Sequence, residues 1–212
     1  MSREVHHPLF ARLFDRMAAK TEEQGAAEHR ERLLAGLGGR VIEVGAGNGL
    51  NFSHYPGTVA EVVAVEPEDY LRAKAERVAE DAPVAIRVVD GLAADLPAED
   101  ASFDAAVASL VLCSVPDQAA ALAELRRVLR PGAELRFYEH VLSDEPRLAR
   151  LQNAVAWLWP LVGGGCHPNR DTVGAIERSG FEIERCERFP FRPSPVMAPV
   201  TPHVIGAATA PG

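Results

Sequence analysis

The residues best suited to chemistry form a glycine-rich segment at the end of the first apolar run. It reads EVGAGNG, from Glu43 to Gly49. Glycines at such a place let backbone amides approach a ligand with no Cβ in the way. A dinucleotide-binding fingerprint, GxGxxG, would need its third glycine at position 50, where this chain has Leu50. The pattern ExGxGxG instead favours a ligand without the pyrophosphate that a helix N-terminus would bind.

Two later segments suit the adenosine part of a cofactor. Glu66 ends the second apolar run, VVAVE, and a carboxylate there can accept hydrogen bonds from both ribose hydroxyls. NAD enzymes use the same device, so Glu66 indicates an adenosine cofactor without choosing between the classes. The third segment, DGLAADLP, begins at Asp90, and its small residues leave a flat apolar slot for an adenine ring.

In this order and at these separations, the three segments resemble the class I S-adenosylmethionine (SAM)-dependent methyltransferases. LPAEDASFD and ELRRVLRPGAEL are similar to the quinone-biosynthesis branch. The resemblance implies SAM as cofactor and a Rossmann-like, doubly wound, mostly parallel seven-stranded sheet with an antiparallel last strand. Many relatives carry an aspartate in place of Leu92, so backbone atoms or Asp90 would contact the adenine amine. The expected cofactor-binding residues are Glu43, Gly45, Ala46, Gly47, Asn48, Gly49, Asn51, Glu66, Pro67, Asp90, Gly91, Leu92, Ala93 and Ser109.

Four segments narrow the resemblance to the mammalian methyltransferase-like alkyl-thiol methyltransferases and their bacterial homologues. They are VIEVGAGNGLNFSHYP, ASLVLCSVPDQ, LRRVLRPGAELRFYEHV and GGGCHPNRDT. This resemblance implies methyl transfer to a small, mostly apolar acceptor, with a thiol favoured. A C- or O-methyltransferase acting on a quinone-like or phenolic ring is the alternative within the class. A dinucleotide-binding oxidoreductase and a non-catalytic SAM-binding protein are alternatives of other classes.

Two histidines are the candidate catalytic residues. His140 follows Glu139 at the end of the fifth apolar run, and His167 lies in a glycine-rich loop. A thiol of pKa about 8.5 is roughly one tenth ionised near pH 7.5, a penalty of about 1.4 kcal/mol, so a thiol acceptor needs little help from a base. We expect His140 to act as base or to orient the acceptor, with Glu139 positioning it. Arg170 is expected to pair with a carboxylate.

The three cysteines predict no metal site. Cys113, Cys166 and Cys186 are far apart and form no CxxC pair, which disfavours zinc, a disulfide framework and arsenite methylation. Cys113 is expected in the core and Cys166 in an exposed loop. Trp157 and Trp159 cannot both face the core from one helix, so one of them is expected to line an apolar acceptor pocket.

The elements that must position these residues alternate in type. Apolar runs predict strands at 40–45, 61–66, 83–90, 103–112 and 133–141, followed by 181–189 and 203–209. Helices are expected at 8–36, 69–80, 117–129, 146–161 and 172–179, the first with an apolar stripe of Leu9, Phe10, Leu13, Phe14 and Met17. Strands alternating with helices are typical of βαβ units and a doubly wound sheet.

Length and composition indicate one domain. The 212 residues divide into a helical lid (1–37), a SAM-binding core (38–142) and an acceptor-side region (143–212). A net charge of −8 disfavours a nucleic-acid substrate. No apolar run approaches the roughly 20 residues of a membrane span, and the start MSREVHHPLF does not resemble a signal peptide or the membrane anchor of the mammalian proteins. These features predict a cytoplasmic protein that acts on a small molecule, and they leave its oligomeric state open.

Overall fold

The computed structural model describes residues 11, 12, 15 and 21–212, and within this part seven strands form one sheet. Their order is β3-β2-β1-β4-β5-β7-β6. All neighbouring pairs from β3 to β5 are parallel, and β7 is antiparallel to both β5 and β6. The predicted doubly wound sheet with an antiparallel last strand is therefore confirmed. The strands are β1 (Gly39–Val44), β2 (Val59–Val65), β3 (Ile86–Val89), β4 (Phe103–Ser109), β5 (Leu129–His140), β6 (Glu182–Pro190) and β7 (Pro202–Thr209).

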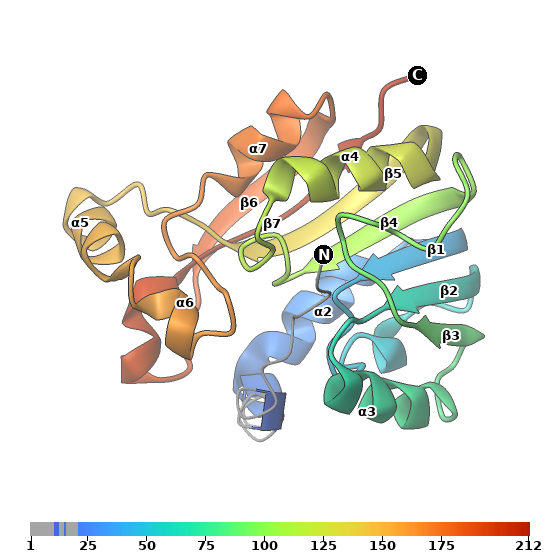
Figure 1. Cartoon of the computed structure of the whole chain (residues 1–212), viewed down its shortest axis with the longest axis horizontal. Coiled ribbons are helices and arrows are strands. Elements are labelled where there is room, and N and C mark those ends of the chain that lie inside the picture. Colours follow the sequence, from blue (N-terminus) through green and yellow to red (C-terminus); the bar gives the residue numbers. More distant parts are fainter. Residues whose placement is uncertain (1–10, 13–14, 16–20) are drawn as a thin grey trace.

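Helices cover both faces of this sheet. α4 (Gln118–Val128) and α7 (Thr172–Arg178) pack on one face, above the sheet in Figure 1. α2 (Ala27–Leu34) and α3 (Asp69–Ala79) pack on the other. Side chains alternate along β1, so Ile42 and Val44 join the first core and Val41 joins the second. Apolar residues are needed on both faces of such a strand, which explains the continuous apolar runs of the sequence.

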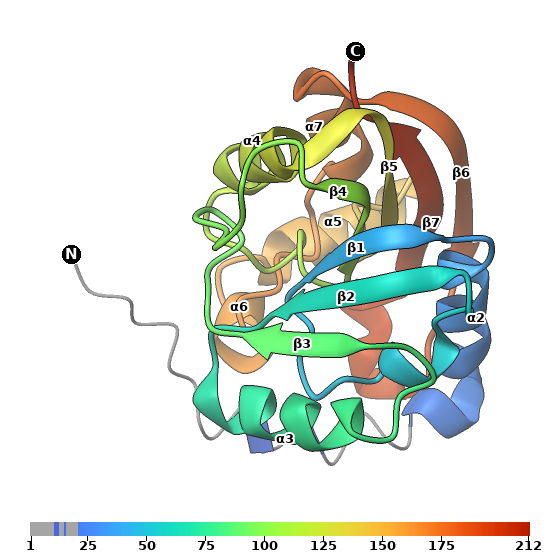
Figure 2. The same cartoon turned by 90° about the vertical axis from the view of Figure 1, so that its right-hand side faces the viewer.

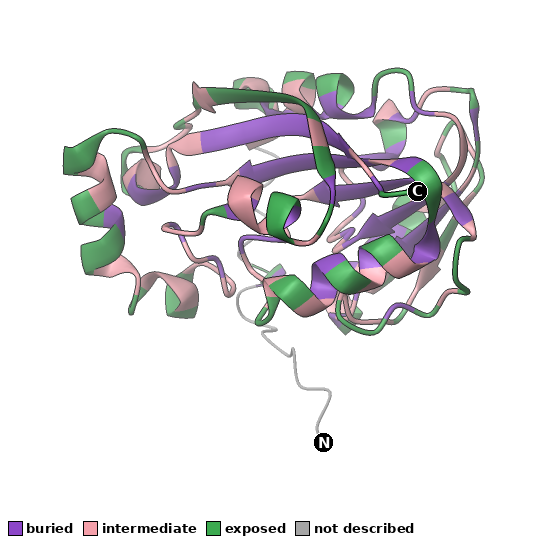
Figure 3. Ribbon diagram, turned by 90° about the horizontal axis from the view of Figure 1, so that it is seen from above, coloured by how far each residue is buried: buried purple, intermediate pink, exposed green. Residues whose placement is uncertain are grey.

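Twist and burial distinguish the centre of the sheet from its edge. Figure 2 shows β1, β2 and β3 turned strongly against β5, β7 and β6, as expected for the twist of a large sheet. The central strands are buried along most of their length, whereas β6 at the edge is mostly exposed (Figure 3). Among the helices of the described residues, none is both long and apolar enough to cross a bilayer.

Acidic side chains cap three of the helices at their N-termini. Glu68 accepts a hydrogen bond from the backbone N–H of Leu71 at the start of α3, and Asp117 does the same for α4. Asp171 caps α7, as the sequence indicates. α4 ends at Val128, close to the expected 129, but β5 begins at once at Leu129 and not at the expected residue 133. Pro131-Gly132 therefore lies inside an irregular first part of β5, next to a register shift against β4.

Two expected helices are interrupted. The described part of the 8–36 helix consists of a π-helical segment η1 (Glu22–Ala26) and α2, with a break at Gly25, whose φ is +116°. Its apolar stripe, Leu9, Phe10, Leu13, Phe14 and Met17, lies outside the described residues.

The 146–161 helix is divided into α5 (Pro146–Val155) and α6 (Trp159–Val162). Pro160 has no backbone N–H to donate, so it fits the first turn of a new helix and not the interior of a long one. Two 3-10 helices, η2 (Phe52–His54) and η3 (Pro195–Val200), complete the elements. α5 and α6 lie together beyond one end of the sheet (Figure 1).

Candidate active site

A cavity of about 650 Å³ lies at the carboxyl ends of the parallel strands. The order of the strands reverses between β1 and β4, which is where ligands bind in doubly wound sheets. Gly45, Glu66, Leu92, Leu110 and His140 line the cavity, one from the end of each parallel strand from β1 to β5 or the loop that follows it. One continuous space therefore joins the expected cofactor segments to the expected acceptor side.

The glycine segment takes up left-handed backbone conformations. Gly45 has a φ of +63° and Gly47 one of +60°, a region that side chains with a Cβ rarely occupy. A Cβ on Gly45 would also lie 2.3 Å from Cγ2 of Val111. Gly45 is thus required by the close approach of the loop after β4, in addition to any contact with a ligand.

Glu66 is a buried carboxylate at the edge of the cavity. Its Oε2 accepts a hydrogen bond from the backbone N–H of Gly47 (2.8 Å), and its Oε1 accepts one from that of Glu68 (2.9 Å). Burial raises the pKa of Glu66, while the N–H groups of Glu68 and Gly47 stabilise the charged form. Each carboxylate oxygen keeps a further lone pair, so Glu66 can bind a diol in the cavity while holding the glycine loop in place.

The other expected cofactor residues fall into two groups. Pro67, Gly91, Leu92 and Ala93 line the cavity with Gly45, Gly47 and Glu66. In the part of the chain that the structure describes, the cavity lining does not include Glu43, Ala46, Asn48, Gly49, Asn51, Asp90 or Ser109.

Glu43 supports the glycine loop from behind. It accepts hydrogen bonds from Nδ2 of Asn51 (2.8 Å) and from the hydroxyl of Tyr55 (2.7 Å), all three side chains being buried. Burial raises the pKa of Glu43 to about 7, against the hydrogen bonds of Tyr55 and Asn51, which lower it. Ala46 is part of the core that α2 and α3 cover. The exposed Asp90 forms an ion pair with Arg72 (3.4 Å).

Arg30 is a cavity residue that the sequence reasoning missed. It reaches the cavity from α2, and its Nη1 donates to Oδ1 of Asn51 (2.8 Å) and to Oγ of Ser109 (3.3 Å). Its Nε bonds to Glu22 (3.0 Å). Arg30 lies three residues before the buried Leu33, a spacing that places both on the inward face of the helix. This spacing was the one signal in the sequence that could have identified Arg30.

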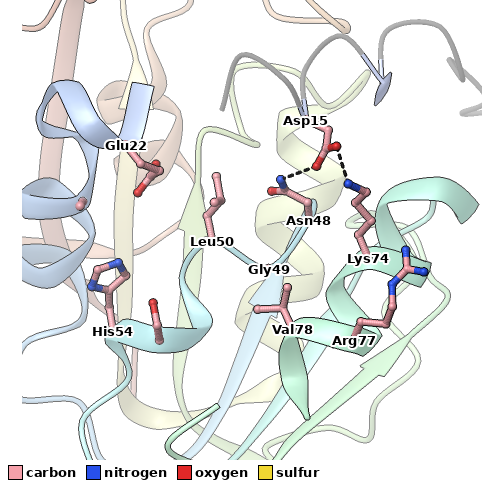
Figure 4. Close-up of a pocket in the computed structure, with 11 residues that line it drawn as sticks. Asp15, Glu22, Asn48, Gly49, Leu50, His54, Lys74, Arg77 and Val78 are labelled. Atoms are coloured by element: carbon pink, nitrogen blue, oxygen red, sulfur yellow. Dashed lines mark hydrogen bonds and ion pairs between the residues drawn. The ribbon is translucent and has the colours of Figure 1, made fainter. Parts of the chain in front are cut away.

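A second pocket, of about 580 Å³, is lined by Asn48 and Gly49 of the glycine loop (Figure 4). Asp15 points into it and accepts hydrogen bonds from Nδ2 of Asn48 (3.1 Å) and from Nζ of Lys74 (2.5 Å). The N-terminal segment is therefore bonded at Asp15 both to the glycine loop and to α3.

Glu139 and His140 point to different sides of β5. The carboxylate of Glu139 is fully buried and accepts hydrogen bonds from the backbone N–H groups of Val111, Leu112 and Cys113 (2.8–3.0 Å). Burial raises the pKa of Glu139. Glu139 was expected to position His140, but its direct partners belong to the turn after β4. His140 lines the cavity, as a candidate catalytic residue must.

The second expected histidine does not reach the cavity in the described structure. Nδ1 of His167 bonds to the carbonyl of Gly165 (2.8 Å). His203, which was not among the expected catalytic residues, lines the cavity instead, with its ring centroid 4.6 Å from that of His140. Burial and the neighbouring His140 hold the pKa of His203 well below its usual range.

Two of the three cysteines converge on His140, which corrects the expectation that they are far apart. Sγ of Cys113 lies 3.5 Å from Nδ1 of His140, and Sγ of Cys166 lies 3.4 Å from the same nitrogen. Cys166 was expected in an exposed loop but is buried. A hydrogen bond with Cys166 and burial raise the pKa of the Cys113 thiol. Fifty-two residues separate these cysteines in the sequence, and only the folding of the late loop brings them together.

A buried glutamine holds that late loop against the sheet. Nε2 of Gln152, in α5, donates to the carbonyls of Val141, Pro168 and Pro199 (2.8–3.0 Å). Its Oε1 accepts from the backbone N–H of Ser143 (2.8 Å). This one side chain therefore joins the end of β5, the loop that carries Cys166, and η3.

The cavity wall around Trp159 is mainly apolar. Trp159 lines it, whereas Trp157 is 76% exposed, so the expectation that one tryptophan faces the pocket is confirmed. Arg170 was expected to pair with a carboxylate, but its Nη1 donates to the carbonyl of Leu112 (2.7 Å). The apolar side chains on this side are Leu110, Val111, Val115, Trp159, Val162, Val196, Met197 and Val200.

Comparison with known proteins identifies the family. A model of the methyltransferase domain matches residues 42–137. Thiol S-methyltransferase TMT1B of Mus musculus is 34% identical over 207 residues, which cover 94% of this chain and 82% of TMT1B. Thiol S-methyltransferase TMT1A of Homo sapiens is 31% identical over 202 residues, with coverages of 88% and 80%. The crystal structure of a SAM-dependent methyltransferase from Mesorhizobium loti matches with a TM-score of 0.62 at 20% identity, covering 87% of this chain and 98% of that one.

The chain therefore belongs to the class I SAM-dependent methyltransferases, in the family that includes TMT1A and TMT1B. It is an enzyme of methyl transfer, with SAM as the methyl donor.

Proposed function

We propose that this methyltransferase transfers the methyl group of SAM to the sulfur of a small, mostly apolar thiol. The observation that carries the proposal is the cavity, which continues from Gly47 and Glu66 to an apolar wall around Trp159 and His140. The similarity to TMT1A and TMT1B, which are named thiol S-methyltransferases, supports a thiol over a ring carbon or a phenol.

On the cofactor side, Glu66 would bind the ribose hydroxyls, and Leu92 and Ala93 would contact the adenine ring. SAM supplies a methyl group already activated on a sulfonium sulfur. The task of these residues is therefore orientation, which can contribute about 7–11 kcal/mol in a well-placed pair. The left-handed backbone at Gly47 keeps this part of the cavity wall free of a side chain.

On the acceptor side, the apolar wall would exclude water and hold the alkyl part of the thiol. Deprotonation of a free thiol costs only about 1.4 kcal/mol near pH 7.5. A strong buried base is therefore unnecessary. This fits the cavity, whose lining offers the imidazoles of His140 and His203, while the carboxylate of Glu139 already accepts hydrogen bonds from three backbone N–H groups.

We also propose that residues 1–212 act as one domain, with 1–37 as a lid, and that the protein works in the cytoplasm on a small molecule. The net charge of −8 supports this over a nucleic-acid substrate.

A panel of alkyl thiols, aryl thiols and phenols, incubated with isotope-labelled SAM and analysed by mass spectrometry, tests the substrate class. We expect the label on sulfur, with turnover increasing with the apolar surface of the thiol. Labelling of a phenol or quinone while every thiol stays unlabelled would overturn the thiol assignment and leave the methyltransferase class intact.

A further inference from the structure

The cluster of Cys113, His140 and Cys166 has the geometry of a metal site. Its three ligand atoms lie within 4.8 Å of one another. A tetrahedral Zn²⁺, with Zn–S of about 2.3 Å and Zn–N of about 2.0–2.1 Å, separates sulfur from nitrogen by about 3.6 Å. The two sulfur-to-Nδ1 distances are 3.5 Å and 3.4 Å. One ion at the centre would therefore need little movement of the three side chains.

Backbone hydrogen bonds hold the two cysteine-bearing segments in place before any ion binds. Glu139 accepts the N–H of Cys113 (3.0 Å), and it lies next to His140 in β5. The backbone N–H of His167 donates to the carbonyl of Cys113 (2.8 Å), which ties the residue after Cys166 to the turn after β4. A site whose ligands are fixed from behind in this way is pre-organised, which favours binding.

The open side of the cluster faces the cavity. His140 and Cys166 line the cavity, whereas Cys113 is fully buried behind them. The three protein ligands thus approach an ion from the cavity wall and leave its fourth position to the cavity. Three protein ligands with one open position characterise catalytic zinc sites, and two cysteines with one histidine form one such set. Thiolate and imidazole together select thiophilic ions over Mg²⁺ or Ca²⁺.

We propose that Cys113, His140 and Cys166 bind a thiophilic divalent cation of the Zn²⁺ type, whose open position takes the sulfur of the acceptor thiol. The role of the ion in acceptor binding rests on the proposed thiol specificity, whereas the site itself does not. The acceptor R–SH binds as the thiolate and releases its proton to water. A sulfur lone pair then forms the new S–CH₃ bond while the S–CH₃ bond of the sulfonium breaks. The electrons of that bond remain on the departing sulfur, which gives S-adenosylhomocysteine and a neutral thioether, a weak ligand that leaves the ion.

Cobalt(II) added to the reduced, metal-free full chain tests the site directly, because thiolate ligands give cobalt an intense charge-transfer band in the near ultraviolet. We expect saturation at about one equivalent, with displacement by Zn²⁺. Cys113→Ser, Cys166→Ser and His140→Gln should each weaken or abolish the band. Cys186→Ser is the matched control, since Cys186 is exposed on β6, and it should leave the band unchanged.

Calorimetry with SAM serves as the control for folding, because a variant that is folded should still bind SAM. No band with the wild type, or a band that persists undiminished in folded Cys113→Ser and Cys166→Ser, overturns the site.

Addition of an alkyl thiol to the cobalt form tests the open position. We expect the band to gain intensity or shift, and the zinc-loaded enzyme to methylate the thiol at least about tenfold faster than the chelator-treated enzyme. An unchanged spectrum, together with equal rates of thiol methylation with and without zinc, would refute acceptor binding at the ion while confirming the proposed function. Cobalt binding without methylation of any thiol would contradict the proposed function and leave only the metal site.

Discussion

The proposed cofactor half and the proposed acceptor half of the cavity are built in different ways. On the cofactor side, Gly45 and Gly47 follow β1, Glu66 follows β2, and Leu92 follows β3. Each of these residues lies in a short segment directly after a strand, and the parallel strands all end at the same edge of the sheet. This half therefore depends on local backbone conformation at a few positions, above all on the left-handed glycines.

The acceptor half is assembled from segments that are distant in sequence. Five different segments contribute to it: the turn after β4 with Cys113, β5 with His140, α6 with Trp159, the late loop with Cys166, and β7 with His203. Buried polar side chains, Glu139 and Gln152, hold these segments together. The comparison indicates that cofactor binding should depend strongly on one or two residues. Acceptor binding should depend on several residues, so each single mutation there should have a smaller effect.

The largest effect is expected from Gly47→Val. Valine resists the φ of +60° at this position, and its side chain would enter the space along the loop that the cofactor needs. Calorimetry should show no binding of SAM by a protein that remains folded by circular dichroism. Gly57→Val is the control, since a Cβ there meets no atom within 4 Å. Normal SAM binding by a folded Gly47→Val variant would show that the loop is wrongly assigned.

Glu66→Ala should weaken SAM binding by about 1.5–3 kcal/mol, the range for hydrogen bonds to a charged group. A SAM analogue without the ribose hydroxyls should lose this amount against the wild type and little against the variant. Glu61→Ala, at the other end of the same strand, should bind SAM like the wild type. Equal losses for the analogue against both Glu66→Ala and the wild type would remove Glu66 from the ribose site.

His140→Ala should reduce the turnover of an alkyl thiol about tenfold to hundredfold, at or below the low end of the loss for a full general base. His167→Ala should change turnover less than about threefold, because the His167 ring bonds to the carbonyl of Gly165 away from the cavity. Steady-state kinetics of both variants on one thiol compares the two directly. A larger loss in His167→Ala than in His140→Ala would contradict the assignment of the acceptor side.

Trp159→Ala should raise the KM for apolar thiols about threefold to tenfold, which corresponds to roughly 0.7–1.4 kcal/mol of lost apolar contact. Trp157→Ala, on the exposed neighbour, should leave KM unchanged. The difference should shrink for short-chain thiols, whose alkyl part cannot reach the tryptophan. If KM responds equally to both substitutions, Trp159 does not form the acceptor wall.

Glu43→Gln is expected to have the smallest effect on activity. Its main effect should be on how the stability of the protein depends on pH. The folded-state pKa of Glu43, about 7, lies above the ordinary glutamate value of 4.5. Its contribution to stability is therefore present at low pH and is lost as the pH rises from about 4.5 through 7. Glu43→Gln should remove this loss. In urea unfolding, the free energy of unfolding of the variant should therefore rise relative to that of the wild type between pH 5 and 8. Glu61→Gln controls for the removal of one negative charge. A difference that stays constant with pH would mean that Glu43 is ionised throughout.

The sequence by itself determined the series of strands, the glycine loop, Glu66 and the segment around Leu92, whereas the antiparallel last strand was implied by the family resemblance. Strands buried on both faces need continuous apolar runs, and a left-handed turn needs glycine, so these features leave a local signal. Even there, the sequence could not show that Glu43 and Asn51 support the loop from behind while Arg30 lines the cavity. Only the tertiary structure decided the acceptor side. The proximity of Cys113 to Cys166 depends on Glu139 and Gln152 bonding distant backbone groups, and such long-range hydrogen bonds impose no spacing on the sequence.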